Sequence, residues 1–598
     1  MFALLAVTLA AASPCGLADA TLDVRAGGRE RSPPIAWTTG PDGGATGRAA
    51  DPAFDARVTI GPPRGGARTL EVELTWREEI GAERVALRLR LAGAPRAVDR
   101  ALGFRPIDRP IRVGRGTPVV VAAGEDLLVG GAGIAGARIA PRKGPDGAAG
   151  VEVTLLADDA DDRPFATYPV CTDRLDTFAQ HGQFGALEHK LPHREAQRHA
   201  GETERLSAVV YALDPDRPAR PVVVERWPGG ARAAVVFTDH ADRTDPEALR
   251  AILWGASDAA GTPGRGFLGR GVRLTRSFFV HALAGGLDDE ATAAAADDLV
   301  AAGSEVALHS ITDFRDPPAT VREGLASAAR WAPETWIDHQ PYTNCEAFSS
   351  EGWQASGPFG GRDELARGGV RWIWAAGDVA GFRAVEVANV LATGPADAAS
   401  PAIYPFAADP RLWIFQSSMF YATPDALAEA LSGLALERLE EARGLFVGHT
   451  YFGAGPRETT GTVQRERLAV RRAGWGGLEL VPALDEALAR IEARVAAGAL
   501  ASLTWAEAGD RLRALGDVAV SYRPDGTVEL SNAGDWPLPG LTVGVPEEGL
   551  ELTVDGAGPV GRVDLPGWSR ATFDLPPHGR VRLRASRGGA DGAVVPLP

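Results

Sequence analysis

The feature that most constrains the fold is a change in hydrophobic periodicity near residue 231. Up to there, apolar and polar residues alternate in short runs, such as RTLEVELTW at 68–76. From about 231 to 515, apolar stretches alternate with Ala- and Glu-rich stretches such as DEATAAAADDLVAAG. Alternation at period two predicts half-buried strands, whereas strands that alternate with helices predict a parallel α/β sheet or barrel. Period-two runs return over the last 80 or so residues.

These patterns divide the 598 residues into three predicted domains, since one hydrophobic core rarely organises so long a chain. We expect a β-rich, sandwich-like domain over 21–225, an α/β domain over 226–515 and a small β-sandwich over 516–598. The Pro-rich stretch 214–230 is predicted to be the linker that leads into the α/β domain.

The first twenty residues, MFALLAVTLAAASPCGLADA, predict a signal peptide over 1–20. Their apolar stretch is too short to span a bilayer, and Ala18-Asp19-Ala20 fits the small-x-small pattern of a cleavage site. We therefore expect export to the periplasm, cell envelope or outside of the cell, with no transmembrane segment in the mature protein. Cleavage would leave Cys171 and Cys345, whose spacing allows a disulfide without implying one.

The formal net charge of −16 argues against a nucleic-acid partner. Proteins that bind phosphate backbones need clustered positive charge, and the excess charge of this chain is acidic. No oligomeric state is predicted by the sequence.

The histidines of the middle segment gather at the ends of predicted strands. His240 follows AAVVFTD, His281 follows RSFFV, His309 follows EVAL and His449 follows LFVG, while His339 lies in the loop-like TWIDHQPYTN. In parallel α/β barrels the carboxyl ends of the strands meet at one rim, where chemistry collects. Each histidine alone could cap a backbone group, but their number together predicts a site.

Ordered motifs over roughly residues 231–450 resemble those of the polysaccharide deacetylase family, metal-dependent carbohydrate esterases with a distorted (β/α) barrel. Residues 237–240, FTDH, are similar to the family's T-F-D-D motif. Residues 303–313, GSEVALHSITD, contain the lead-in and first His-Ser of its H-S-x-x-H motif. Residues 339–342, HQPY, approximate its R-x-P-Y motif, and 445–449, LFVGH, resemble a late strand that ends in histidine. The resemblance implies a distorted (β/α) barrel over 226–515.

The chain differs from the family at two metal positions. His240 stands where the family has Asp, and Asp313 stands where it has the second His. The exchange preserves a set of two imidazoles and one carboxylate, so the resemblance implies a divalent metal, with zinc expected, held by His240, His309 and Asp313. His309 and Asp313 are four residues apart and could share one face of a helical turn. Asp242 is the alternative carboxylate ligand, and a simple surface pair of His309 with Asp313 stays open.

The resemblance also implies roles in catalysis. Asp239 corresponds to the general base, His449 to the general acid and the backbone N–H of Tyr342 to the oxyanion donor. The family's Arg of the third motif is absent, and His339 either substitutes for it or is an ordinary loop histidine. Asp239 could instead be a turn residue after a strand.

The expected function is therefore metal-dependent hydrolysis of an acyl group, most simply acetyl, from a carbohydrate substrate. One alternative is a non-catalytic glycan-binding or envelope protein on a degenerate deacetylase barrel. A second is a hydrolase of the same fold that cleaves another amide or a glycosidic bond.

Overall fold

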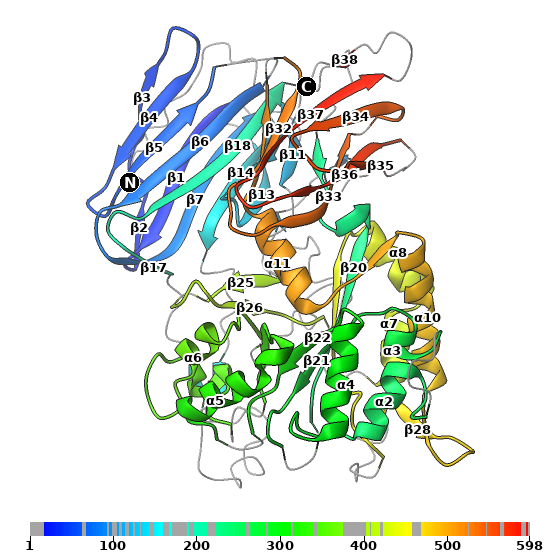
Figure 1. Ribbon diagram of the computed structural model, residues 1–598. Helices are drawn as coiled ribbons and strands as arrows, with labels where there is room; N and C mark the ends of the chain where they lie inside the picture. The colour runs from blue at the N-terminus through cyan, green and yellow to red at the C-terminus, as the bar shows by residue number, and fades with distance from the viewer. Residues whose placement is uncertain are drawn as a thin grey trace.

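The computed structural model describes residues 17–598 with the exception of several segments. Those outside the description are 63–66, 93–94, 99–103, 107–109, 114–118, 124–125, 132, 144–148, 160–166, 170–187, 191–195, 213–221, 243, 259–263, 283–284, 313–314, 340–343, 375–401, 407, 419–422, 457–467, 524, 546, 563–566, 588–593 and 596–598. Within the described part, two β-sandwiches lie beside each other above an α/β unit (Figure 1). The expected multidomain, β-rich architecture is confirmed.

The N-terminal unit consists of two antiparallel sheets, which the period-two alternation predicts. One has the strand order β10-β13-β14-β7-β1-β2, with β17 beside β7, and the other has the order β3-β4-β5-β6-β18-β12-β11-β8-β9. Alternate residues of both sheets, such as Val24, Leu74 and Leu87, enter one shared core. A separate pair, β15 (Thr167–Pro169) and β16 (Glu188–Lys190), follows.

The strands of the first sheet are β1 (Leu17–Ala26), β2 (Arg29–Arg31), β7 (Ile80–Ala92), β10 (Ile111–Val113), β13 (Gly136–Lys143), β14 (Ala149–Asp159) and β17 (Ala196–Arg198). Those of the second are β3 (Ala36–Thr39), β4 (Ala45–Ala50), β5 (Phe54–Ile60), β6 (Ala67–Trp76), β8 (Pro95–Val98), β9 (Phe104–Pro106), β11 (Val120–Ala123), β12 (Asp126–Gly130) and β18 (Thr203–Ala212). Strand β1 begins ahead of the predicted cleavage point, and Ala20 pairs with Leu89 of β7. Cleavage after Ala20 would therefore remove the first four residues of this strand.

The central unit is built on a mainly parallel sheet of order β25-β26-β24-β23-β22-β21-β20-β27, with β30 beside β20. Its strands are β20 (Ala233–Asp239), β21 (Thr275–Phe278), β22 (Glu305–Leu308), β23 (Thr335–Ile337), β24 (Trp372–Trp374), β25 (Ile403–Pro405), β26 (Trp413–Phe415), β27 (Leu445–Thr450) and β30 (Leu500–Ser502). Only β25 runs antiparallel to its neighbour among these pairs. The strand and helix alternation predicted for this segment is thus present.

The sheet curls, but a closed (β/α) barrel is not shown. Ser418, which follows β26, donates its backbone N–H to the carbonyl of Val447 in β27 at 2.7 Å. Among the described residues no strand pairing joins β25 or β26 to β27. The outline is therefore that of an open, curled sheet in which one backbone contact links the two ends.

Helices cover the sheet, mostly on one face. They are α2 (Pro246–Trp254), α3 (Gly266–Gly269), α4 (Glu290–Ala301), α5 (Pro318–Ala328), α6 (Arg362–Arg367), α7 (Pro424–Ala430), α8 (Gly433–Glu441), α10 (Pro482–Ala496) and α11 (Trp505–Leu515), with short turns η2 (Pro228–Gly230), η3 (Ala329–Trp331) and η4 (Phe348–Gly352). Side-chain caps stabilise the N-termini of several helices. Asp245 accepts hydrogen bonds from two N–H groups of α2, and Thr504 forms a capping box with Glu507 at the start of α11. Helix α11 lies between the sheet and the two sandwiches (Figure 1).

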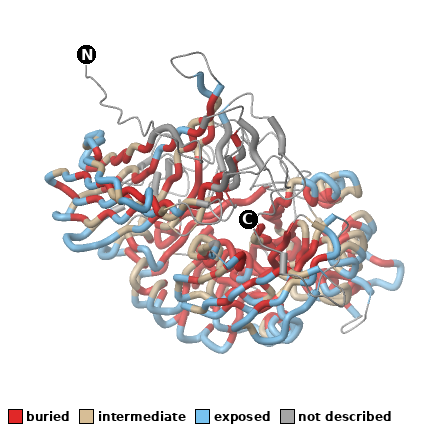
Figure 2. Tube along the Cα trace, turned by 90° about the horizontal axis from the view of Figure 1, so that it is seen from above, coloured by how far each residue is buried: buried red, intermediate tan, exposed pale blue. Residues whose placement is uncertain are grey.

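Strand β20 is buried on both faces and divides two cores. Val235 and Phe237 pack with helix residues such as Leu249 in one core. Ala234 and Val236 pack on the other face with a second core that contains Trp374, Val447 and Trp505. Figure 2 shows buried residues gathered inside each unit, with exposed residues on the outer surfaces of helices and loops. This alternation decides which side chains can meet at the end of β20.

The C-terminal unit is a small β-sandwich with strand orders β19-β33-β36-β35 and β31-β32-β37-β34, with β38 beside β37. Its strands are β19 (Val223–Val224), β31 (Val518–Tyr522), β32 (Val528–Asn532), β33 (Leu538–Val545), β34 (Leu550–Asp555), β35 (Gly561–Arg562), β36 (Ser569–Leu575), β37 (Arg580–Arg587) and β38 (Val594–Val595). A two-stranded ribbon, β28 (Val470–Arg472) with β29 (Leu478–Leu480), lies in the α/β unit. Residues 223–224, which composition assigned to the N-terminal domain, pair with β33 instead. The domain to which these two residues belong is decided only by their pairing with a strand about three hundred residues away in sequence.

Two further findings bear on the expectations for export. Within the described part of the chain, no helix is both long and apolar enough to cross a bilayer. Cys345 is disulfide-bonded, and the other two cysteines, Cys15 and Cys171, both lie outside the described residues.

Candidate metal centre

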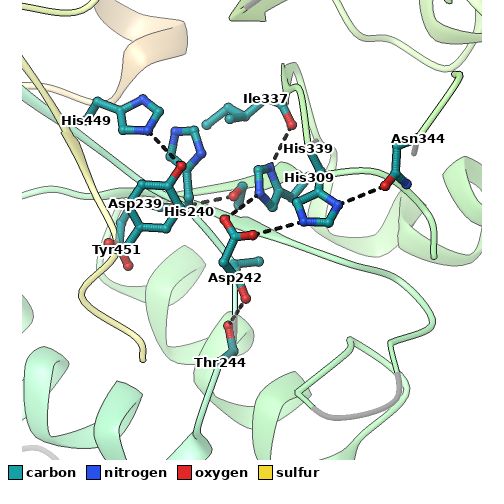
Figure 3. Close-up of polar contacts among 12 residues, drawn as sticks. Asp239, His240, Asp242, Thr244, His309, Ile337, His339, Asn344, His449 and Tyr451 are labelled. Carbon is teal, nitrogen blue, oxygen red and sulfur yellow. Dashed lines mark hydrogen bonds and ion pairs between the residues drawn. The ribbon is translucent and has the colours of Figure 1, made fainter. Parts of the chain in front are cut away.

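His240 lies at the centre of a cluster of imidazoles where the strands β20, β22, β23 and β27 end (Figure 3). Its side chain has no solvent exposure, and neither ring nitrogen has a hydrogen-bond partner. The ring centroid of His240 lies 3.6 Å from that of His449, 4.9 Å from that of His309 and 5.1 Å from that of Trp374. A buried imidazole with two unsatisfied nitrogens is costly, so its environment indicates a missing partner.

His309 is fixed between a backbone carbonyl and a carboxylate. Its Nδ1 lies 2.8 Å from the carbonyl oxygen of Ile337, and its Nε2 lies 3.1 Å from Oδ2 of Asp242. The carbonyl can only accept, so Nδ1 of His309 must carry the proton and donate it. In the neutral ring, Nε2 then presents a lone pair to another acceptor.

His339 faces the other oxygen of the same carboxylate. Its Nε2 lies 2.9 Å from Oδ1 of Asp242, and its Nδ1 lies 3.0 Å from Oδ1 of Asn344. Asp242 is thus held between two imidazoles, as Figure 3 shows. Its side chain is 24% exposed, which makes it the most accessible group of this cluster.

His449 completes the cluster from the end of β27. Its Nε2 lies 3.1 Å from the hydroxyl of Tyr451, and its ring centroid lies 4.3 Å from that of Trp374. His240 and His449 therefore sit beside an aromatic wall made by Trp374 and Tyr451. This wall excludes water from one side of the cluster.

Asp239 belongs to a different environment, although it is adjacent to His240. Its Oδ2 accepts from Arg276, and its Oδ1 accepts from Thr450 Oγ1 at 2.9 Å and from the N–H of Phe452 at 2.6 Å. Alternation along β20 places Asp239 on the same face as Phe237, in the core packed by helices. The three donors leave room for one more on Oδ2.

The residues fit a metal ion. Ligand atoms of His240, Asp242 and His309 lie within 4.8 Å of one another, and His309 Nε2 and Asp242 Oδ2 are already 3.1 Å apart. Ligand atoms of a tetrahedral zinc ion are about 3.3 Å apart, so a small inward movement of His240 would suffice. Two imidazoles and a carboxylate suit zinc and also other divalent ions of the first transition row.

Electrostatics keeps these groups in the state that metals require. Burial lowers the pKa of His240 well below its usual value, and the charges of His449 and His309 lower it further. Burial likewise lowers the pKa values of His449 and His309. Burial alone would raise the pKa of Asp242, but His339 and His309 oppose this and the net pKa is well below its usual value. Neutral imidazoles and an ionised carboxylate are the forms that bind metals.

The structure brings together His240, Asp242, His309, His339 and His449. Asp313 and Tyr342, which the sequence suggested as metal ligand and oxyanion donor, lie outside the described residues. His281 lies at the surface and pairs with Asp288 at 3.3 Å instead of joining the cluster.

Sequence reasoning missed Arg276, Asn344 and Glu346. Arg276 is an arginine inside the buried strand TRSF, a signal that could have indicated a buried ion pair. Asn344 and Glu346 lie in an irregular loop, where periodicity gives no information about side-chain contacts.

Comparisons with known proteins give no family for this chain. No family model matches it, and none of the curated proteins matches it. Among solved structures, a polysaccharide lyase aligns at 14% sequence identity with a TM-score of 0.18, over 39% of this chain and 30% of that one. A rhamnosidase from Novosphingobium sp. PP1Y aligns at 12% identity with a TM-score of 0.12, over 97% of this chain and 74% of that one. At these TM-scores neither likeness bears on the fold or function of this chain.

Proposed function

We propose that this protein is an exported, metal-dependent hydrolase that removes an acyl group, most simply acetyl, from a carbohydrate. The main observation in favour of a bound metal is the placement of His309 between two acceptors, the carbonyl of Ile337 and the carboxylate of Asp242. A second proton on this ring is opposed by its burial, since the residue is only 1% exposed. A divalent cation between Nε2 and the carboxylate satisfies both atoms.

His240 supports the same proposal independently. Both of its ring nitrogens are buried without a hydrogen-bond partner, and one of them belongs to the group of ligand atoms that includes His309 and Asp242. We therefore assign His240, Asp242 and His309 as metal ligands, with Asp313 as the alternative carboxylate. The motif resemblance over residues 231–450 supports a deacetylase-type (β/α) barrel for this unit.

A bound zinc ion would polarise a substrate carbonyl and bring the pKa of its water toward about 7. The Nδ1–H bond to Ile337 orients His309 so that its Nε2 points into the site. His449, next to His240 and bonded to Tyr451, is placed to move a proton to the leaving group. The Trp374 side chain, only 2% exposed, keeps water from the inner side of the cluster.

One observation favours a non-catalytic glycan-binding protein as the rival. Asp239, the residue that corresponds to the family's base, already accepts three hydrogen bonds, including that of Arg276. A carboxylate held by three donors, one of them a guanidinium, is a poor proton acceptor. The rival predicts zinc and oligosaccharide binding without release of a product.

The test combines metal content with product analysis. Elemental analysis of purified protein should give about one zinc or similar ion per chain. Incubation with panels of N-acetylated and O-acetylated oligosaccharides should release acetate without new reducing ends, and a zinc chelator should abolish the release. Binding of the oligosaccharides without release of acetate would establish the non-catalytic glycan-binding protein. New reducing ends would indicate cleavage of a glycosidic bond.

The disulfide of Cys345 supports export. Structural disulfides persist in oxidising compartments and are rare in the cytosol of most cells. N-terminal sequencing of the protein after expression in a secreting host would show whether cleavage follows Ala20 or an earlier residue.

A further inference from the structure

We propose that Asn344 and Glu346 are positioning residues of the metal centre, which act through His339 to fix the carboxylate of Asp242. The inference rests on the metal site proposed above and extends it to two loop residues that do not contact the ion. We refer to Glu346, Asn344 and His339 as the relay.

The relay is a continuous chain of hydrogen bonds. Nδ2 of Asn344 donates to Oε1 of Glu346 at 2.7 Å, and Oδ1 of Asn344 lies 3.0 Å from Nδ1 of His339. Nε2 of His339 lies 2.9 Å from Oδ1 of Asp242. Figure 3 shows the last two of these contacts.

The contacts of Asn344 fix which atoms of the relay donate hydrogen bonds and which accept them. Nδ2 of Asn344 faces two acceptors, Glu346 Oε1 and the carbonyl of Thr312 at 3.3 Å. A rotated amide would place its oxygen against both of them, so Oδ1 must face His339. Nδ1 of His339 therefore carries a proton. The hydrogen bond from Nε2 to Oδ1 of Asp242 needs a second proton on the ring, so His339 holds this carboxylate as an imidazolium.

Glu346 itself is held in place by three donors. Its carboxylate accepts from Ser310 Oγ and from the backbone N–H of Asp316 at 3.0 Å, as well as from Asn344. The residue is 1% exposed. Ser310 has a φ of 112°, a backbone conformation that is costly for a residue other than glycine and that these contacts hold in place.

The consequence concerns the two oxygens of Asp242. His339 engages Oδ1, which directs Oδ2 toward Nε2 of His309. Asp242 follows β20 and is partly exposed, so without His339 its carboxylate would be free to rotate away from the site. Groups that orient a metal ligand in this way typically contribute 10- to 100-fold to metal affinity.

A reversal of the Glu346–Asn344 pair tests the proposal. Asn344→Asp places two carboxylates face to face, and Glu346→Gln places an NH2 group against a donor in either orientation. Each single variant should bind zinc about 10- to 100-fold more weakly in chelator competition. The double variant Asn344→Asp/Glu346→Gln restores one donor and one acceptor between these two residues with their order reversed, although the bond to the carbonyl of Thr312 stays lost. Its zinc affinity should therefore exceed that of both single variants, a non-additive result.

His339 supplies the second arm of the experiment. In a His339→Ala background, Asn344→Asp should change zinc affinity by less than about threefold, because the relay is already interrupted. Glu305→Gln is the matched control, since Glu305 is a buried carboxylate at the opposite end of β22 and should leave zinc affinity unchanged. Thermal unfolding of each variant checks that it is folded.

Two results would overturn the proposal: wild-type zinc affinity in both single variants, or an equal loss from Asn344→Asp with and without His339. A wild-type protein that binds no zinc overturns it together with the proposed metal site. Zinc binding with the expected relay behaviour, but without hydrolysis of any acetylated oligosaccharide, overturns the hydrolase proposal alone.

Discussion

Arg276 donates a hydrogen bond from Nη1 to Oδ2 of Asp239, and neither side chain has any solvent exposure. The same guanidinium also bonds the hydroxyl of Thr244. Asp239 in turn accepts from Thr450 and Phe452, so the pair joins β20, β21 and the segment after β27. These contacts are those of a structural ion pair on the face of the sheet opposite His240.

Loss of one partner of this pair should destabilise the protein strongly. Arg276→Met leaves Asp239 charged, buried and uncompensated, and we expect the free energy of unfolding to fall by about 3 to 5 kcal/mol in urea titration. The double variant Arg276→Met/Asp239→Asn should lose less than the sum of its single variants. If Asp239 were instead a general base, Asp239→Asn would retain wild-type stability and lose about two to four powers of ten in turnover.

The identity of the carboxylate ligand can be decided by two matched variants. Asp242→Asn should weaken zinc binding strongly, because Oδ2 of Asp242 lies 3.1 Å from His309 Nε2 and a neutral amide is a poor ligand. Asp313→Asn should leave the affinity within about threefold of the wild type. Chelator competition at one pH measures both, and the opposite ranking would assign the site to Asp313.

His449 should affect turnover more than metal content. We expect His449→Asn to reduce kcat for acetate release by about two to four powers of ten, the usual contribution of a positioned acid, while zinc content stays near the wild-type level. His281→Asn is the control, because the side chain of His281 is exposed and pairs with Asp288, away from the cluster. Equal activities of the two variants would remove His449 from the mechanism.

Glu305 should contribute a loss of stability as the pH rises from about 4.5 to 7, whereas the lowered pKa values of His240, His309 and His449 act in the opposite direction. Burial raises the pKa of Glu305 from 4.5 to about 7, although bonds from Thr335, Ala506 and Thr275 oppose the shift. Between these values the folded protein keeps a proton that the unfolded chain releases, so unfolding becomes easier as pH increases. The full effect is roughly 3 kcal/mol.

Glu305→Gln should remove the contribution of Glu305 and make the fall of stability with pH less steep, while Glu346, whose pKa burial also raises to about 7, keeps its own contribution. The amide of Gln can replace a protonated carboxyl, with its NH2 group donating to the hydroxyl of Thr335. Chemical denaturation at several pH values between 4.5 and 7.5 measures the slope. A slope identical to that of the wild type would show that Glu305 does not titrate in this range.

Much of the fold could be predicted because it depends on local periodicity. Period-two runs predicted the two sandwiches, and alternating apolar and Ala-rich stretches predicted elements such as α4 and β27. Strand ends also predicted which histidines could meet, and His240, His309 and His449 do lie together. Whether the sheet closes into the expected barrel could not be predicted in this way, because closure depends on pairing between its first and last strands, and no such pairing is present among the described residues.

The contacts around the site were decided by the tertiary structure. Arg276 and Asp239 are 37 residues apart, and the register of β20 against β21 brings them side by side. Asn344 bonds both His339 and the carbonyl of Thr312, which lies 32 residues away in sequence.

The sequence by itself determined the β-rich, multidomain architecture, the alternation of strands and helices in the central segment and the set of histidines available for a site. These properties follow from residue types and from spacing along the chain, which fix the apolar face of each element. The tertiary structure alone decided that Asp242 lies between two imidazoles, that Asp239 pairs with Arg276 and that residues 223–224 join the C-terminal sandwich. The reason is physical: hydrogen bonds and ion pairs depend on distances between segments remote in sequence, and these distances are set by sheet register and packing.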